Sequence, residues 1–313
     1  MFRDLVDMIS ESGYLSLHKT GELAKRSNML YEILESCELC PRKCSVNRLK
    51  DEVGYCQMGK ELVVSSFSPH FGEEKALVGV FGSGTIFLVG CNLLCVYCQN
   101  YDISHYRVGR IVSEEEVADF MIVLQNKRCH NINLVTPTHY APQLVKSIEI
   151  GVKKGLRIPV VWNCSGYENV KVIRLLDGIV DIYLPDIKYG QSSSAKLYSK
   201  APDYFERCKE SVTEMYRQVG NLKLDEDEIA YRGLIVRHLV LPENQAGSKE
   251  VLHYLRDLSK DVFVNIMDQY RPEGRAGDYE ELDRCITSKE FRSAIQIAKN
   301  LGLWHLDKFL NRL

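Results

Sequence analysis

The chain has 313 residues, of which 45% are hydrophobic and 26% charged, so it can bury one large core and a small appendage. Its formal net charge of -2 gives no overall electrostatic reason to expect a nucleic-acid partner. No apolar run approaches the ~20 residues of a membrane helix, and the opening MFRDLVDMIS lacks the basic-then-apolar plan of a signal peptide. We therefore expect a cytoplasmic protein that has no membrane partner.

The 11 cysteines are numerous for a cytoplasmic protein, and seven of them fall into two tight groups before residue 100. Disulfides rarely persist in a reducing compartment. Clustered thiols in such a protein more often bind metal than pair with one another. The other four are dispersed, and we expect most of them to be buried packing residues: Cys129, Cys164, Cys208 and Cys285.

The N-terminal part of the chain contains no clear strand pattern. Residues 1–36 are predicted to form short helices, because apolar residues recur there at helical spacing. Residues 37–60 are predicted to form a compact loop that carries four cysteines. Residues 66–84 are rich in glycine and contain a proline, and we interpret them as a connection. We therefore divide the chain into an N-terminal segment, 1–75, and a main domain, 76–313.

The main domain alternates short apolar runs with helical segments. Capping-box signatures predict that one helix begins at Ser113, with Glu116, and that the last begins at Thr287, with Glu290. A further helix is predicted at 142–154. The apolar runs have the character of buried strands: 85–90, 132–136, 158–163, 180–185, 234–242 and 262–267.

Six strands that alternate with helices predict an α/β fold with a parallel sheet and right-handed crossovers. A doubly wound sheet and a partial barrel both satisfy this pattern. In either fold, binding and catalytic residues gather at the carboxyl ends of the strands. Residues directly after each apolar run are therefore the first candidates for a functional site.

Three cysteines follow the first predicted strand in the run GCNLLCVYCQN. Cys91, Cys95 and Cys98 have the spacing C-x3-C-x2-C, and Tyr97 precedes the last of them. Three thiolates on one tight loop can bind three irons of a cubane and leave the fourth iron open. An open iron can chelate the amino and carboxylate groups of S-adenosylmethionine (SAM), which is the cofactor chemistry that this arrangement serves.

The structural alternatives are a zinc knuckle, or cysteines that pack as small hydrophobic residues. Zinc usually requires four ligands, and the loop offers no fourth cysteine or histidine. The position of the loop at the carboxyl end of a strand also favours a catalytic site. We therefore interpret Cys91, Cys95 and Cys98 as ligands of a catalytic [4Fe-4S] cluster.

The other cysteine group precedes the main domain and has the spacing C-x2-C-x3-C-x11-C. Four thiolates can close a tetrahedral zinc site or hold a whole cubane. A small segment rich in loops cannot form its own core, so a metal would stabilise it. Zinc and an auxiliary iron–sulfur cluster both remain open, with zinc slightly favoured because no redox motif accompanies the group. The proposed ligands are Cys37, Cys40, Cys44 and Cys56.

These motifs together resemble the radical SAM superfamily. Within it, the chain is similar to proteins related to the pyruvate formate-lyase activating enzyme. The resemblance is carried by phrases spread over nearly the whole chain: CELCPRKCSVNR, FGSGTIFLVGCNLLCVYCQN, NINLVTPTHYAP, VDIYLPDIKYG, LIVRHLVLP and VNIMDQYRP. It implies a partial (β/α)6 barrel, like an incomplete TIM barrel, with a small N-terminal helical extension that is rich in cysteine and binds metal.

The resemblance also implies a set of residues that contact SAM. VVWNCSGYE matches a segment near the ribose, with Asn163 in place of an acid and Ser165 where an asparagine is usual. DIYLPDIKYG matches an Asp-x-Lys motif and places Asp186 and Lys188 near the polar end of the cofactor. Arg237 matches a basic position on the fifth strand that suits a carboxylate. The alternatives are an exposed salt bridge for Asp186 and Lys188, and a buried ion pair for Arg237.

One departure from the family pattern concerns the loop after the second strand. Many members have Gly-Gly-Glu there, whereas this chain has Thr136, Pro137, Thr138 and His139. The glutamate that often contacts the methionyl amino group is therefore absent. Thr136, Thr138 and His139 are the candidate replacements, and the alternative is that they only shape the loop.

The function implied by the resemblance is reductive cleavage of SAM to a 5'-deoxyadenosyl radical that abstracts hydrogen. The expected enzyme is oxygen-sensitive, takes electrons from a donor such as flavodoxin or ferredoxin, and generates a glycyl radical on a partner enzyme. Alternatives are radical modification of a small molecule, a peptide or an RNA, and a metal-binding adaptor without catalysis. A radical methyltransferase would need an extra cysteine, for which Cys164 and Cys285 are the weak candidates. Gln269 and Tyr270 could reach the substrate, and the alternative for Tyr270 is that it packs under the following loop.

Overall fold

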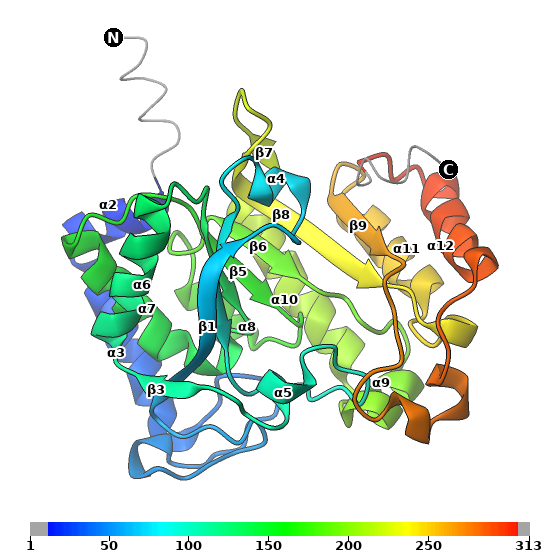
Figure 1. Ribbon diagram of the computed structural model, residues 1–313, viewed down its shortest axis with the longest axis horizontal. Helices are drawn as coiled ribbons and strands as arrows, with labels where there is room; N and C mark the ends of the chain where they lie inside the picture. Colours follow the sequence, from blue (N-terminus) through cyan, green and yellow to red (C-terminus); the bar gives the residue numbers. More distant parts are fainter. Residues whose placement is uncertain (1–11, 306–313) are drawn as a thin grey trace.

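The computed structural model describes residues 12–305, and its centre is one curved sheet with helices on its outer side (Figure 1). The strand order is β3-β1-β2-β4-β5-β6-β8-β7, and β9 pairs with β8. Six successive strands of this sheet run parallel. They are β2 (Ser83–Leu88), β4 (Ile132–Val135), β5 (Val160–Cys164), β6 (Ile182–Pro185), β8 (Ala230–Leu239) and β9 (Phe263–Met267).

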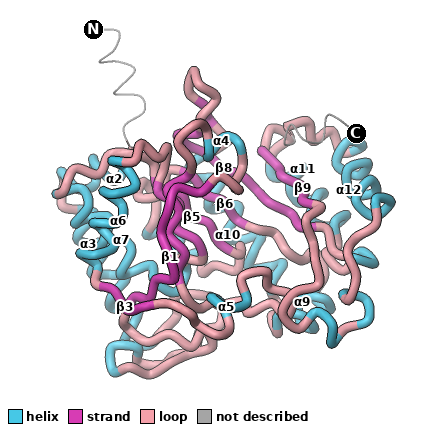
Figure 2. Tube along the Cα trace, viewed as in Figure 1, coloured by secondary structure: helices cyan, strands magenta, loops and turns pink. Residues whose placement is uncertain are grey.

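Each parallel strand overlaps one of the six predicted runs, so the predicted α/β fold with a partial (β/α)6 barrel is confirmed. The runs were recognisable because strands in a parallel sheet are covered on both faces and are therefore apolar throughout. β5 illustrates this, because all five of its residues are buried. Figure 2 shows these strands grouped at the centre and the helices around them.

The helices cover the outer face of the barrel. Both predicted capping boxes are present, Ser113 with Glu116 at the start of α6 and Thr287 with Glu290 at the start of α12. The outer helices are α6 (Glu114–Asn126), α7 (Ala141–Lys153), α8 (Val170–Leu175), α9 (Ser192–Ser199), α10 (Tyr204–Val219), α11 (Ser248–Leu258) and α12 (Ser288–Asn300). None of the helices within residues 12–305 is both long and apolar enough to cross a membrane.

The N-terminal helices α2 (Gly13–Lys19) and α3 (Glu22–Glu32) pack on the barrel beside α7 (Figure 1). They confirm the helices predicted within residues 1–36, as far as these residues are described. The prediction for the first 11 residues, including the expected lack of a signal peptide, lies outside the described part of the chain.

The interpretation of residues 66–84 as a turn-rich connection was wrong in its first part. These residues begin inside β1 (Leu62–His70), which pairs antiparallel with β2 and with β3 (Arg110–Val112). The strand was not predicted because serines and a proline interrupt its apolar pattern and because it is only partly buried. It is stabilised by neighbours that are far away in the sequence. Phe67, for example, stacks on Phe120 of α6 with ring centroids 4.0 Å apart. β1 thus joins the barrel sheet although it precedes the predicted domain boundary.

A short helix, α4 (Lys75–Val78), closes one end of the barrel. It follows β1, whose last residue pairs with the first residue of β2, so α4 lies at the amino ends of the parallel strands (Figure 1). Leu77 of α4 is fully buried and packs in one cluster with Val161, Ile182 and Ile235 from three of these strands. With this end filled, the barrel is left open at the carboxyl ends of its strands.

Candidate active site

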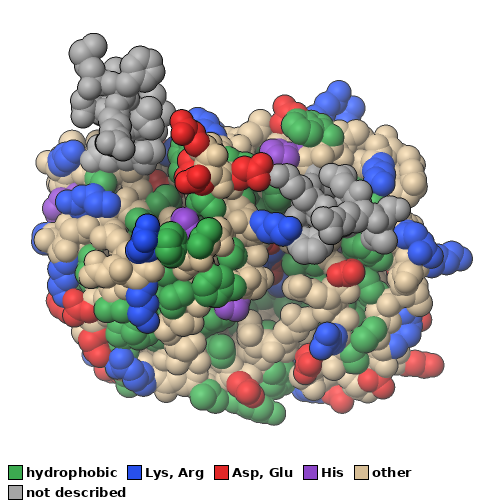
Figure 3. Space-filling view, turned by 45° about the horizontal axis from the view of Figure 1, so that its top comes forward, with side chains coloured by type: hydrophobic (Ala, Val, Ile, Leu, Met, Phe, Trp, Pro, Cys, Tyr) green, Lys and Arg blue, Asp and Glu red, His purple; other side chains and the backbone are tan. Residues whose placement is uncertain are grey.

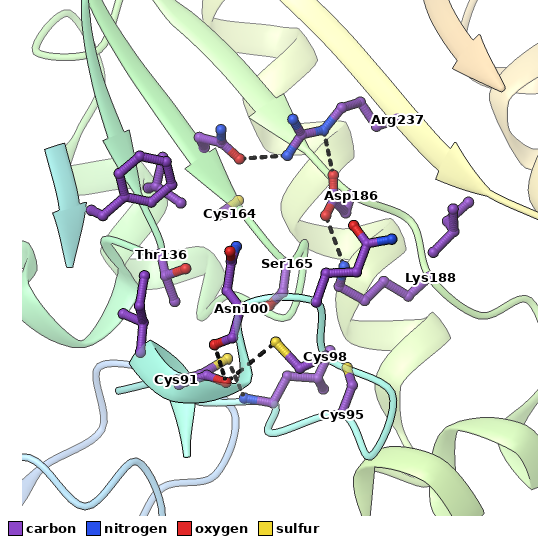
Figure 4. Close-up of a pocket in the computed structure, with 18 of the residues that line it drawn as sticks. Cys91, Cys95, Cys98, Asn100, Thr136, Cys164, Ser165, Asp186, Lys188 and Arg237 are labelled. Carbon is purple, nitrogen blue, oxygen red and sulfur yellow. Dashed lines mark hydrogen bonds and ion pairs between the residues drawn. The ribbon is translucent and has the colours of Figure 1, made fainter. Parts of the chain in front are cut away.

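A cavity of about 350 Å³ lies at the carboxyl ends of the parallel strands. Its wall is built from residues at or near the carboxyl ends of β2, β4, β5, β8 and β9, from two residues just after β6, and from the loop between β2 and α5 (Tyr101–Ser104). Figure 4 shows side chains from these separate segments pointing toward one space. The cavity therefore has the location that parallel α/β folds use for binding and catalysis.

The three-cysteine loop forms one side of this cavity. Cys91, Cys95 and Cys98 all line it. The backbone N–H of Leu93 donates to Cys91 Sγ at 3.3 Å, and the Ser104 hydroxyl donates to Cys98 Sγ at 3.2 Å. Burial, followed by the neighbouring thiols, raises the pKa of Cys91 to about 12. Such a thiol ionises when a metal cation binds it, and the donated hydrogen bonds favour the resulting thiolate.

The arrangement fits a cluster with an open iron. Among the described residues, no three histidine, cysteine or acidic side chains surround a position for a single metal ion. A cubane instead places each thiolate on a separate iron atom. The only further thiol among the residues that line the cavity is Cys164, which lies on β5 and not on the loop. The loop thus offers three thiols to one cavity and leaves room for an exogenous ligand.

A network of charged side chains faces the loop across the cavity (Figure 4). Asp186 lies at its centre, accepting from Lys188 Nζ at 2.8 Å and from Arg237 Nε at 2.6 Å. Arg237 Nη2 also donates to Asn163 Oδ1 at 2.6 Å. These four residues come from the ends of three different strands, as the sequence predicted, and all four line the cavity.

The electrostatics of this network keep its members charged. Burial alone raises the pKa of Asp186, but the cations of Arg237 and Lys188 outweigh burial and lower that pKa below its usual value. Burial lowers the pKa of Lys188, but the charges of Asp186 and Cys95 outweigh it and raise that pKa above its usual value. Lys188 also lies close enough to Cys98 to lower the pKa of that thiol against the larger effect of burial. A stable positive charge is therefore held beside the three-cysteine loop.

Sequence reasoning missed one acidic residue in this network. Glu73 follows β1, lines the cavity and accepts from Arg237 Nη1 at 3.0 Å. Its neighbour Glu74 is buried and accepts from Asn265 Nδ2 at 3.0 Å. Two adjacent glutamates in a segment rich in glycine carry no sign of this role. Only the antiparallel pairing of β1 with β2 brings them to the barrel interior.

The loop after β4 contributes one of its three candidate residues to the cavity. Thr136 lines it and has a left-handed backbone, with φ of 61°. Thr138 is buried away from the cavity lining and donates to Glu168 Oε1 at 2.5 Å. His139 is also buried, its Nε2 is 2.8 Å from Val89 O, and burial lowers its pKa to about 3. Thr138 and His139 therefore shape the loop in this structure.

The remaining predicted contacts divide in the same way. Ser165 and Tyr97 line the cavity, and the Tyr97 ring packs edge-on against Tyr270 with centroids 5.8 Å apart. Tyr270 is buried and donates to Leu282 O at 2.8 Å, so it packs beneath the cavity wall. Gln269 reaches the cavity. Cys285 is exposed and does not line the cavity.

The four-cysteine group lies outside the cavity lining, but its members are close together. Cys56 and Cys37 lie close enough to Cys40 to raise the pKa of its thiol. Cys37 and Cys44 raise the pKa of Cys56 in the same way. Burial is the main cause that raises the pKa of both Cys40 and Cys56. The backbone N–H of Tyr55 donates to Cys44 Sγ at 3.2 Å. By its chemistry, a set of four thiols suits a thiophilic metal, although in this structure the four sulfur atoms, like the other described His, Cys, Asp and Glu side chains, do not surround a position for a single ion.

Comparisons with known proteins agree with this geometry. A sequence model of the radical SAM superfamily matches residues 85–221, which contain the three-cysteine loop and strands β2 to β6. An uncharacterized protein of Methanocaldococcus jannaschii is 32% identical over 280 residues, covering 87% of this chain and 76% of the relative. A second uncharacterized protein of that organism is 23% identical over 308 residues, covering 89% of this chain and 82% of the relative.

The chain therefore belongs to the radical SAM superfamily. Membership implies a [4Fe-4S] cluster and SAM as cofactors, in keeping with the loop and the cavity. A crystal structure of a radical SAM methyltransferase from Sphaerobacter thermophilus is 15% identical, with a TM-score of 0.47. The similarity covers 70% of this chain and 64% of that chain, which is less than two thirds of its length.

Proposed function

We propose that this protein cleaves SAM reductively and uses the product to abstract a hydrogen atom from a substrate. When bound, the cluster and SAM supply an electron and a 5'-deoxyadenosyl radical. The observation that carries this proposal is that the three-cysteine loop and the Asp186–Lys188–Arg237 network face each other across one cavity. A structural cluster would need neither an open coordination position nor fixed charges opposite it.

The side chains of the cavity have separate roles in this proposal. Cys91, Cys95 and Cys98 hold the cluster. Lys188 offers a point charge to the methionyl carboxylate, and Asp186 orients Lys188 while it accepts from hydroxyl groups. The other residues that line the cavity complete the pocket around the cofactor: Tyr97, Thr136, Asn163, Ser165 and Arg237.

Glu73 supplies a carboxylate to the cavity although the loop after β4 lacks the glutamate of the family pattern. It is held by Arg237, and its side chain is only 8% exposed. A carboxylate in this place is suited to an ammonium group. We include it in the proposal as a candidate contact for the methionyl amino group.

The finer parts of the proposal concern partners and the second metal. The electron donor is a small redox protein such as flavodoxin or ferredoxin, and the macromolecular substrate is a glycyl radical enzyme. Acidic and basic side chains are interspersed on the face in Figure 3, in keeping with the net charge of -2, which favours a protein or small-molecule substrate over RNA. Cys37, Cys40, Cys44 and Cys56 bind zinc or an auxiliary cluster. We expect an oxygen-sensitive, cytoplasmic enzyme.

Product analysis tests the chemistry directly. Anaerobically reconstituted protein is incubated with SAM and dithionite, and 5'-deoxyadenosine and methionine are quantified. We expect both products from the wild type and from Cys285→Ala, because that exposed thiol does not line the cavity. Cys95→Ala should form neither. Undiminished cleavage by Cys95→Ala would rule out the assignment. A glycyl radical signal on a partner enzyme encoded beside this gene would then identify the substrate.

A further inference from the structure

One arginine connects the four-cysteine group to the three-cysteine loop. Arg42 donates from Nε to Asn92 O at 3.0 Å and from Nη2 to Leu93 O at 3.4 Å. Asn92 and Leu93 directly follow Cys91, so Arg42 binds the backbone of the loop between its first two cysteines. Arg42 Nη2 also donates to Ser199 O at 2.7 Å, at the end of α9. A single guanidinium therefore ties the loop to the barrel.

Two aromatic rings fix the guanidinium of Arg42 in this position. Its central carbon lies 3.7 Å from the centroid of the Tyr55 ring and 5.2 Å from that of Tyr167. Both contacts have the geometry of cation–π interactions. Tyr167 holds the same loop by a second route, because Asn92 Nδ2 donates to Tyr167 O at 2.6 Å. The tie is therefore a packed unit and not an isolated surface contact.

The position of Arg42 depends on the two cysteines that flank it. Arg42 stands between Cys40 and Cys44 in the run CPRKC, and Tyr55 directly precedes Cys56. Within residues 37–61, the only helical or strand element is η2 (Arg48–Lys50), a single 3-10 turn. Beyond this turn, the segment therefore has no helix or strand that would fix the positions of Arg42 and Tyr55. A metal held by the four cysteines would fix both side chains at once.

The same segment also packs directly against the start of the three-cysteine loop. Gly90 precedes Cys91 and has a left-handed backbone, with φ of 84°. A Cβ atom placed on Gly90 would lie 2.6 Å from Met58 Cγ and 3.1 Å from Cys56 O. Only glycine fits this approach, so the chain after Cys56 and the chain before Cys91 are in van der Waals contact. The two cysteine groups are thus neighbours in space.

We propose that the metal-loaded four-cysteine segment is a bracket that holds the catalytic loop, and that Arg42 is the positioning residue through which it acts. This inference rests on the proposed function, since it requires a cluster at Cys91, Cys95 and Cys98. Metal in the segment fixes Arg42, and Arg42 fixes the carbonyl groups between Cys91 and Cys95. Without that metal the loop would be held less firmly, so Cys91, Cys95 and Cys98 would hold the catalytic cluster less tightly and the cluster would respond less to SAM.

Arg42→Gln and Arg42→Lys test this inference, with Lys43→Gln as the matched control. Lys43 is exposed in the same loop, and its substitution removes the same charge. Three quantities are measured after anaerobic reconstitution: zinc and iron content, the rate at which a chelator removes iron, and the change that SAM causes in the electron paramagnetic resonance spectrum of the reduced cluster. None of these three measurements depends on the catalytic activity of the protein.

For Arg42→Gln we expect the metal of the four-cysteine segment to be retained. The catalytic cluster should lose iron about tenfold faster, the scale of one charge-assisted hydrogen bond, and its response to SAM should be reduced. Arg42→Lys should be intermediate, because lysine keeps the charge but lacks the forked donors. Lys43→Gln should behave as the wild type. Wild-type iron loss and SAM response in Arg42→Gln would overturn the inference.

Removing a ligand of the segment provides the second test. Cys44→Ser should lose the metal of the segment and should match Arg42→Gln in its iron loss and SAM response. The inference would be overturned if the cluster of Cys44→Ser were stable and responded to SAM. If a protein donor then failed to reduce that cluster while dithionite did, the segment would be an electron relay instead. Failure of the proposed function is distinguishable, because the wild type itself would then hold no SAM-responsive cluster.

Discussion

The two cysteine groups differ more in their surroundings than in their residues. The three-cysteine loop follows a buried parallel strand, and its thiols line a cavity together with fixed charges. The four-cysteine group lies in a segment of loops, outside the cavity lining, where three of its four thiols are buried and the fourth is partly buried. Figure 1 places the segment beside α5, at the edge where the strands end.

This contrast shows that the structure around a thiol determines which kind of metal site the thiol can form. A rigid strand end that presents three ligands to a cavity leaves one coordination position for a substrate or cofactor. A loop that supplies four ligands completes the coordination of its metal and gains stability from it. We therefore expect the same side chain to serve catalysis in one region and structure in the other.

The largest expected effect separates the metals of the two regions. Elemental analysis of reconstituted wild-type protein should give about four irons with about one zinc, or about eight irons if the segment holds an auxiliary cluster. Cys98→Ala should lose the four irons of the catalytic cluster and keep the metal of the segment, because four other cysteines bind that metal. A wild-type protein with no metal beyond the four irons would contradict the metal-bound segment.

The next effect concerns the charges that only the cavity possesses. Lys188→Ala should weaken SAM binding by about ten- to a hundredfold, since one charge-assisted hydrogen bond contributes roughly 1.5–3 kcal/mol. Thermal stability and iron content should change little, because Asp186 retains Arg237 as its partner at 2.6 Å. Calorimetric titration and a melting curve on the same variant measure both quantities.

Lys196→Ala is the matched control for this prediction, because Lys196 lies nearby in the sequence on α9 and is exposed. It should bind SAM as the wild type does. Unchanged affinity in a destabilised Lys188→Ala protein would show that the Asp186–Lys188 ion pair supports the fold and not the cofactor.

The smallest effect comes from a buried acid close to Cys40 of the four-cysteine group. Glu168 accepts a hydrogen bond from Thr138, and its charge raises the pKa of both Cys40 and Cys164. Burial raises the pKa of Glu168 from 4.5 to about 8. The folded protein then holds a proton that the unfolded chain has already lost, so the stability that this group contributes falls as pH rises from about 4.5 to 8 and is level above that.

Glu168→Gln should remove this part of the pH dependence, with its largest relative gain in melting temperature near pH 8. The expected gain is a few degrees, because 1 kcal/mol moves the midpoint by about 2–4 °C in domains of about 150–250 residues and by less in longer chains. The exposed Glu115→Gln serves as control. A Glu168→Gln protein whose melting temperature follows pH as the wild type does would contradict the raised pKa.

Much of the fold and the site was predictable, because both depend on patterns that are local in the sequence. β5 and the other parallel strands are buried on both faces, so each appears as a continuous apolar run. Asp186 and Lys188 follow such a run and alternate with Ile187, so both point to the cavity while Ile187 is fully buried. The spacing of the three cysteines indicated the cluster site in the same way.

The remainder depends on contacts between distant segments, which no local pattern records. β1 is only partly buried and was hidden by its serines and proline, although β2 stabilises it. Glu73 reaches the cavity only because β1, which it follows, pairs antiparallel with β2. The sequence places Arg42 beside cysteines, where its charge favours their thiolates, but it gives no sign that Arg42 binds a loop 50 residues away.

We infer that the three-cysteine loop holds a cluster with an iron open to SAM. The most direct measurement is the electron paramagnetic resonance spectrum of the reduced, reconstituted protein recorded with and without SAM. We expect a [4Fe-4S] signal whose shape changes when SAM is added, and the loss of this response in Cys95→Ala. A wild-type signal that is unchanged by saturating SAM would contradict it.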